Sequence, residues 1–289
     1  MIVITGAGGT LGGLVLDRLL ERVPREQVAI SVRDAATVER FAPRVARVVE
    51  ADYADPASLP AAFEGAEQLL LVSANAPGPG QAAALHETAI DAATAAGVGR
   101  IVYTSHQAAG HDSAFGPMPG HARTQELLAA SGVPHVVLRN GFYASSVPWL
   151  LGDAATTGRL VTPADGPVSW TAHADLADAA VAVLVGESQL DDPAPPLTAA
   201  EAVDMAQVAA LLTELTGRPV EHVVAADEDW VAAQVAQGQP EGRARFTVGI
   251  FRAAREGEFD VVDPVLGSLI GRPPTPLRDV LAASLPTGG

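Results

Sequence analysis

Short apolar runs alternate with longer amphipathic segments through the first half of the chain. Runs that are apolar throughout are typical of strands buried on both faces, as in a parallel sheet covered by helices. On this pattern we expect strands at Ile2 to Thr5, Val28 to Arg33, Val45 to Glu50, Gln68 to Val72, Ile101 to Thr104 and His135 to Arg139.

The segments between these runs have helical spacing. Leu11, Val15 and Leu19 recur every four residues and so line one face of a helix that ends near Pro24. Asp34 is placed to cap the next helix. Helices are expected at residues 36–41, 57–63, 81–96 and 121–130. Strands alternating with helices predict an α/β fold, a Rossmann-type doubly wound parallel sheet.

The pattern changes after Asn140. We expect a strand pair across residues 158–170 with its turn at Asp165, then a helix at 174–185 and a turn or linker at 191–196. Four more helices are expected at residues 205–216, 227–237, 243–256 and 276–283. The sequence thus predicts a sheet domain at residues 1–150. Residues 151–289 are expected to form a smaller, mostly helical lobe over the carboxyl ends of the strands, including segments that pack back on the sheet domain.

The composition excludes several kinds of catalysis and binding. The 289 residues are 48% apolar, with a net charge of −16 that disfavours general nucleic-acid or anionic membrane binding. The chain contains neither cysteine nor lysine, which excludes thiol and lysine catalysis and cysteine-bound metals. No histidine pair has metal-binding spacing, so we expect no metal. No apolar run approaches the ~18 residues that span a bilayer. The chain opens with a strand instead of a targeting segment, so a cytoplasmic location is expected.

The strongest functional signal is a glycine-rich turn between the first strand and the first helix. Gly6, Gly9 and Gly12 would turn the chain sharply, bring amides against a pyrophosphate and pack the helix closely on the sheet. Thr10 and Leu11 open the helix within this turn. The strand–turn–helix context predicts a dinucleotide site.

Further residues at strand ends indicate which nucleotide the site would bind. Arg33 follows the second strand, where it would pair with a 2′-phosphate, so NADP(H) is favoured over NAD(H). Asp34 leaves an alternative open, in which its carboxylate turns inward and Arg33 lies in solvent. Asp52 follows the third strand, where it would either reach the adenine or cap a turn. Residues 73–75 (Ser73, Ala74 and Asn75) follow the fourth strand and would pass beneath the cofactor.

Several segments together resemble one enzyme family. They are the glycine turn, Arg33, the strand end at 102–105, the Leu-Arg-Asn-Gly-Phe-Tyr segment at 138–143 and the Ile-Gly-Arg-Pro-Pro segment at 270–274. The chain resembles the NmrA-like branch of the atypical short-chain dehydrogenases/reductases, in particular its type 2 NAD(P)H:quinone oxidoreductases. The resemblance covers nearly the whole chain and implies that Thr104, Asn140, Gly141 and Phe142 lie at the cofactor, with Tyr143 beside the substrate.

The chain departs from the superfamily's usual Tyr-x-x-x-Lys pair. The lysine position falls on His121 and the tyrosine position on Pro117, so the usual tyrosine proton relay cannot form. A quinone can accept hydride without it. His121 would then bond the nicotinamide ribose in place of lysine and, at its ordinary pKa near ~6.5, could donate a proton. Ser105 and His106 are alternative partners for a substrate oxygen, whereas His86 and His173 carry no functional signal.

We therefore expect an NAD(P)H-dependent reductase of a quinone or similarly activated small acceptor, with His121, Tyr143 and Ser105 as candidate catalytic residues. Two alternatives stay open: a non-catalytic NAD(P)-binding redox sensor that signals to a partner protein, and a biosynthetic tailoring reductase. The sequence also leaves open whether the protein forms a homodimer.

Overall fold

A parallel sheet forms the centre of the computed structural model, which describes residues 1–76, 78, 80–187, 192 and 194–285. Its seven strands run in the order β3-β2-β1-β4-β5-β6-β8, and every neighbouring pair is parallel. The strands are β1 (Ile2–Ile4), β2 (Val28–Val32), β3 (Arg47–Glu50), β4 (Gln68–Leu71), β5 (Arg100–His106), β6 (His135–Asn140) and β8 (Pro196–Leu197). The order reverses between β1 and β4, as in a doubly wound fold, so the predicted fold class is confirmed.

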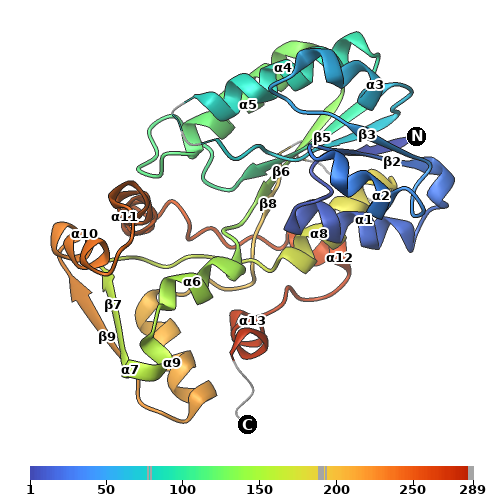
Figure 1. Cartoon of the computed structure of the whole chain (residues 1–289). Coiled ribbons are helices and arrows are strands. Elements are labelled where there is room, and N and C mark those ends of the chain that lie inside the picture. Colours follow the sequence, from blue (N-terminus) through green and yellow to red (C-terminus); the bar gives the residue numbers. More distant parts are fainter. Residues whose placement is uncertain (77, 79, 188–191, 193, 286–289) are drawn as a thin grey trace.

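Helices cover both faces of the sheet (Figure 1). One face carries α3 (Leu59–Phe63), α4 (Gln81–Ala95) and α5 (Met118–Ser131). The other carries α1 (Thr10–Leu20), α8 (His173–Leu184) and α12 (Val265–Ile270). The short α2 (Val38–Phe41) lies between β2 and β3 in the chain. Each face has its own buried apolar cluster, because strands apolar throughout present side chains to both sides.

The prediction that residues 158–170 form a strand pair is wrong. Strand β7 (Arg159–Pro163) pairs in parallel with β9 (Glu221–Ala225), far along the chain. Asp165 therefore forms no hairpin turn. Its carboxylate accepts a hydrogen bond from the amide of Met205 at 2.7 Å, at the start of the helix Met205–Thr216. Alternating apolar positions mark a strand but do not identify its partner.

The linker expected at 191–196 is also corrected. Pro196 belongs to β8, which pairs with β6 at the edge of the sheet. An edge strand tolerates proline because one side of its backbone needs no partner. Residues 188–191 and 193 lie outside the described residues.

The remaining helices gather beside the carboxyl ends of the strands (Figure 1). They are α6 (Val147–Leu151), α7 (Ala154–Thr157), α9 (Met205–Thr216), α10 (Asp227–Ala236), α11 (Glu241–Arg255) and α13 (Leu277–Ser284). A third apolar cluster, which includes Phe142, Trp170 and Phe251, joins α6, α7, α9, α11 and α13. Helix α10 packs on α11 through a separate small cluster that includes Trp230 and Val248. Within the part of the chain that the structure describes, no helix has the length and apolar character needed to cross a membrane.

Candidate functional site

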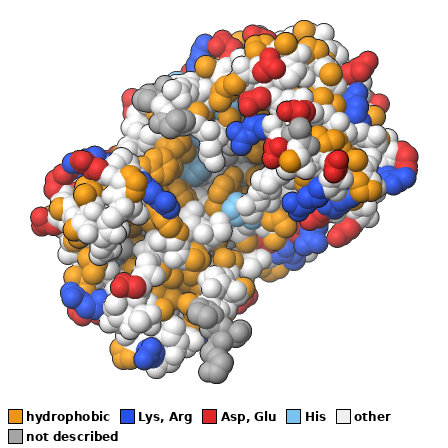
Figure 2. All heavy atoms as spheres, viewed as in Figure 1, with side chains coloured by type: hydrophobic (Ala, Val, Ile, Leu, Met, Phe, Trp, Pro, Cys, Tyr) orange, Lys and Arg blue, Asp and Glu red, His pale blue; other side chains and the backbone are white. Residues whose placement is uncertain are grey.

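A cavity of about 550 Å³ opens at the carboxyl ends of β1, β2 and β4. Eleven of the residues expected in the site line it: Gly6, Gly9, Thr10, Leu11, Gly12, Arg33, Asp52, Ser73, Ala74, Asn75 and Tyr143. The surface between the sheet domain and the helical lobe is hollowed, with histidine and hydrophobic side chains gathered in the hollow (Figure 2).

The glycine turn is shaped by close backbone contacts. Gly6 has φ +64°, which only glycine adopts easily, and its carbonyl accepts the Gly9 amide at 2.9 Å. A Cβ on Gly12 would lie 2.3 Å from the Gly6 carbonyl oxygen. Helix α1 begins here without a side-chain cap and without an acidic residue in its first turn. Its free amides therefore face the cavity and suit a phosphate group.

Arg33 and Asp34 lie at the end of β2, and both line the cavity. Asp34 accepts the Ala36 amide at 2.9 Å, so its carboxylate caps the following turn as expected. Arg33 is exposed and has no hydrogen bond or ion pair to any residue that the structure describes. Its guanidinium is therefore available to an anion in the cavity.

Asp52 and Tyr53 follow β3 and form part of the floor. Asp52 accepts the Ala54 amide at 2.9 Å, so it caps a turn while it lines the cavity. The Tyr53 hydroxyl lies 2.5 Å from Thr5 Oγ1 and 3.1 Å from the Val72 carbonyl. Sequence reasoning missed Tyr53, although an aromatic residue directly after a strand end was a usable signal.

Two side chains beneath the loop after β4 support it by accepting hydrogen bonds from its amides. The Ser73 amide donates to Thr104 Oγ1 at 2.9 Å, and the Ala74 amide donates to His86 Nε2 at 2.7 Å. Thr104 is buried beneath this loop, so it supports a cavity wall that it does not itself line. His86, which carried no functional signal in the sequence, is 1% exposed, and burial lowers its pKa to about 3.

Tyr143 and His173 stand at the far side of the cavity. Their rings lie 4.1 Å apart between centroids, and His173 Nδ1 is 3.3 Å from Ser145 Oγ. Burial raises the pKa of the Tyr143 phenol and lowers that of His173. Sequence reasoning missed His173 because an isolated bridge between Tyr143 and Thr171, distant in sequence, brings it here.

His121 and Ser105 do not line this cavity. His121 Nδ1 lies 2.8 Å from the Tyr103 hydroxyl, and Ser105 Oγ is buried and accepts a hydrogen bond from Gln125 at 2.8 Å. Burial lowers the pKa of His121 to about 4, so the imidazole is neutral near pH 7. The ordinary pKa expected for His121 is therefore wrong, whereas its role in the site stays a prediction.

Asn140, Gly141 and Phe142, at the end of β6 and directly after it, do not line the cavity. Gly141 packs against a neighbouring segment, since a Cβ there would lie 2.1 Å from Thr171 Oγ1. Phe142 lies in the buried aromatic cluster, 5.1 Å from Phe259 and 5.4 Å from His106 between ring centroids. Asn140 is 1% exposed, and both its amide atoms are buried without a well-aligned hydrogen bond among the described residues.

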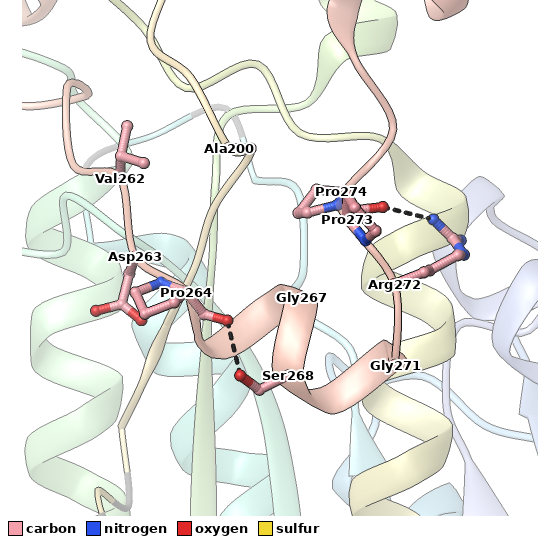
Figure 3. A pocket seen from close by; sticks show the side chains of 10 residues that line it. All are labelled: Ala200, Val262, Asp263, Pro264, Gly267, Ser268, Gly271, Arg272, Pro273 and Pro274. Carbon is pink, nitrogen blue, oxygen red and sulfur yellow. Dashed lines mark hydrogen bonds between the residues drawn. The ribbon is translucent and has the colours of Figure 1, made fainter.

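A second cavity of about 520 Å³ lies beside α12 (Figure 3). Both of its charged side chains are occupied: Asp263 accepts the Val265 amide, and Arg272 pairs with Asp175 at 2.6 Å and Asp178 at 2.9 Å. The Ile-Gly-Arg-Pro-Pro segment thus fastens the C-terminal part of the chain to α8. Over the described ranges, no cluster of three or more histidine or acidic side chains is arranged to hold a metal.

Comparison with known proteins places this site in a family. Residues 6–187 match the family described as NAD(P)H-binding. Quinone oxidoreductase 2 of Escherichia coli (strain K12) is 35% identical over 280 residues, 96% of each chain. The crystal structure of an Escherichia coli NADPH-dependent quinone oxidoreductase with NADPH has a TM-score of 0.92 at 34% identity and covers 98% of this chain and 99% of that one.

A second enzyme structure is similar. The Citrobacter sp. triphenylmethane reductase with NADP(H) has a TM-score of 0.90 at 30% identity and covers 99% of this chain and 100% of that one. The chain therefore belongs to the NAD(P)H-binding, NmrA-like family of atypical short-chain dehydrogenases/reductases, as an enzyme similar to quinone oxidoreductases.

Proposed function

We propose that the protein reduces a quinone, or a similarly electrophilic planar acceptor, with NADPH by direct hydride transfer. The observation that carries the proposal is the cavity, which has free helix-α1 amides and the unpaired Arg33 at one side and Tyr143 and His173 at the other. The NADPH-bound quinone oxidoreductase and the NADP(H)-bound triphenylmethane reductase support the same cofactor.

The glycine turn fits the proposed cofactor. Gly8 lines the cavity, and a Cβ there would have no neighbour within 4 Å, so the turn has open space above it. The free amides of α1 would hold the pyrophosphate, and Arg33 would pair with the 2′-phosphate. Bound NADPH supplies a hydride, that is, two electrons and one proton, to the acceptor.

Two histidines beside the site, which do not line the cavity, carry no positive charge. Burial holds the pKa of His106 at about 3 and that of His121 at about 4, so both rings are neutral near pH 7. We therefore expect the second proton, which completes a hydroquinone, to come from solvent. An acceptor that takes hydride first and a proton afterwards suits such a site, whereas a simple ketone would need proton donation during transfer.

The buried Asn140 amide adds support for a ligand at the carboxyl end of β6. Buried donors and acceptors nearly always have partners, yet neither atom of this amide makes a well-aligned hydrogen bond within the described ranges, and the Tyr143 hydroxyl is the group that interacts with it. A bound group with its own donor and acceptor would satisfy both. The chemical role of the chain is then to hold cofactor and acceptor face to face.

The test is NADPH oxidation against a panel of benzoquinones and naphthoquinones. We expect one NADPH consumed per quinone reduced, and a primary isotope effect with NADPH deuterated at the transferred position. Simple ketones serve as the matched control and should not be reduced. Tight NADPH binding without turnover of any quinone would refute the proposal and favour a redox sensor instead.

A further inference from the structure

A line of buried hydrogen bonds connects the cofactor loop to His121. The Ala74 amide lies 2.7 Å from His86 Nε2, and His86 Nδ1 lies 2.8 Å from Thr124 Oγ1. The Tyr103 hydroxyl lies 3.5 Å from His86 Nδ1 and 2.8 Å from His121 Nδ1. His86, Tyr103 and Thr124 are at most 1% exposed, so solvent does not compete for these contacts.

The direction of the first bond is dictated by the backbone. The Ala74 amide can only donate, so His86 Nε2 must accept and carry no proton. The neutral ring therefore holds its proton on Nδ1. Thr124 Oγ1 accepts this proton's hydrogen bond and donates in turn to the Gly120 carbonyl at 2.8 Å.

This direction determines the next bond. Because His86 Nδ1 already carries a proton, it cannot accept from Tyr103. The Tyr103 hydroxyl is 0% exposed and needs an acceptor. Two acceptors lie beside it: Thr124 Oγ1, which already accepts from His86 Nδ1, and His121 Nδ1 at 2.8 Å, which is therefore the better acceptor. Tyr103 therefore donates, and His121 must carry its proton on Nε2.

We infer that the Ala74–His86–Tyr103 chain fixes His121 as the Nε2–H tautomer. His121 lies outside the lining of the glycine-turn cavity, beside the end of β5, and there it becomes a neutral hydrogen-bond donor to which an oxygen of the bound reactants would be the acceptor. His121 Nε2 has no hydrogen-bond partner within the described residues, and its ring lies 6.3 Å from that of His106 at the end of β5. The inference rests on the proposed function for the identity of that oxygen. His86 and Tyr103 are positioning residues, because they act through His121.

A fixed neutral donor explains how the site works without lysine. An ammonium group donates from any rotation, whereas a neutral imidazole donates from only one nitrogen. If His121 were free to change its tautomer, Nε2 would lack its proton part of the time and could not donate. The buried chain removes this freedom.

The tautomers are measurable by ¹⁵N NMR of the whole protein labelled in histidine, with signals assigned through single His→Gln variants. We expect His86 to carry its proton on Nδ1 and His121 on Nε2. Tyr103→Phe should convert His121 to a mixture of tautomers and leave His86 unchanged. His135→Gln, at the opposite end of β6, is the control and should alter neither signal. Wild-type His121 protonated on Nδ1 would overturn the inference, and this spectrum decides even if Tyr103→Phe does not fold.

Kinetic measurements identify the oxygen that accepts the hydrogen bond from His121. Loss of one neutral hydrogen bond should lower kcat/KM of Tyr103→Phe about five- to tenfold. A raised Kd for NADPH with unchanged quinone KM identifies a cofactor hydroxyl, and the reverse identifies the acceptor oxygen. Unchanged values for both would refute the donor role. Failure of the proposed function looks different: wild-type protein would not reduce quinones, while its tautomers would still be those inferred.

Discussion

Replacing Arg33 with alanine tests which cofactor the cavity prefers. Arg33 lines the cavity at the end of β2 and has no partner within the described residues. Its neighbour Asp34 is already engaged with the Ala36 amide, so it does not neutralise the guanidinium directly. We expect Arg33→Ala to weaken NADPH binding and to leave NADH binding nearly unchanged, because NADH has no 2′-phosphate.

The expected loss of NADPH affinity follows from the solvent exposure of the Arg33 side chain. A hydrogen bond to a charged group contributes about 1.5–3 kcal/mol. Arg33 is exposed, so solvent and salt screen the contact and the lower end applies. About 1.5 kcal/mol corresponds to a rise of about tenfold in Kd. The same screening predicts that the difference between wild type and variant shrinks as salt is raised.

The assay is a titration that follows the fluorescence of NADPH and, separately, NADH at low and high salt. Arg40→Ala is the matched control, since it removes the same charge from nearby α2, where the guanidinium lies 5.2 Å from the Phe41 ring centre and outside the cavity wall. Equal weakening of both nucleotides by Arg33→Ala, or an equal effect of Arg40→Ala on NADPH, would refute the reasoning.

Three further predictions concern the glycine turn, the C-terminal link and pH. Gly12→Ala should lower Tm and NADPH affinity because its Cβ would lie 2.3 Å from a backbone oxygen, whereas Gly8→Ala has open space and should keep its Tm in calorimetry. Arg272→Ala should lower the urea-unfolding free energy by about 1–2 kcal/mol, since the buried Asp175 loses its ion-pair partner but keeps its hydrogen bonds from Thr275, and Arg272 itself is partly exposed; a change below about 0.5 kcal/mol would contradict this. Burial holds the folded-state pKa of His86 at about 3, so the unfolded chain takes up this proton first as pH falls. The stabilisation is therefore complete above about pH 6.5 and declines towards pH 3 by about 1.4 kcal/mol per pH unit. His86→Gln should flatten urea-unfolding stability between pH 7 and 5, and an unchanged slope would count against the burial effect.

The sheet and the glycine turn were predictable because their signals are local. Continuous apolar runs mark buried strands wherever they occur, and Gly6 and Gly12 lie within one turn whose geometry depends on its own residues. The start and end of α9, Met205 and Thr216, agree with the expected bounds, since an Asp204 capping box begins the helix and Gly217 ends it.

Long-range pairing accounts for what the sequence did not reveal. The partner of β7 is β9, and no periodic pattern connects two strands so far apart. His173 reaches the cavity from the start of α8, and His86 reaches the loop after β4 from the middle of α4. The low pKa of His121 is likewise a property of its packed surroundings and not of its neighbours in sequence.

The chain passes repeatedly between the sheet and the lobe. Helix α8 packs on α1, strand β8 pairs with β6, and helix α12 packs on α8 and β8, although all three follow residue 150. A fragment ending at residue 150 would expose the apolar face of α1 and aggregate. Swapping acceptor preference between relatives would likewise require grafting several separate stretches, with α8, β8 and α12 retained from the recipient.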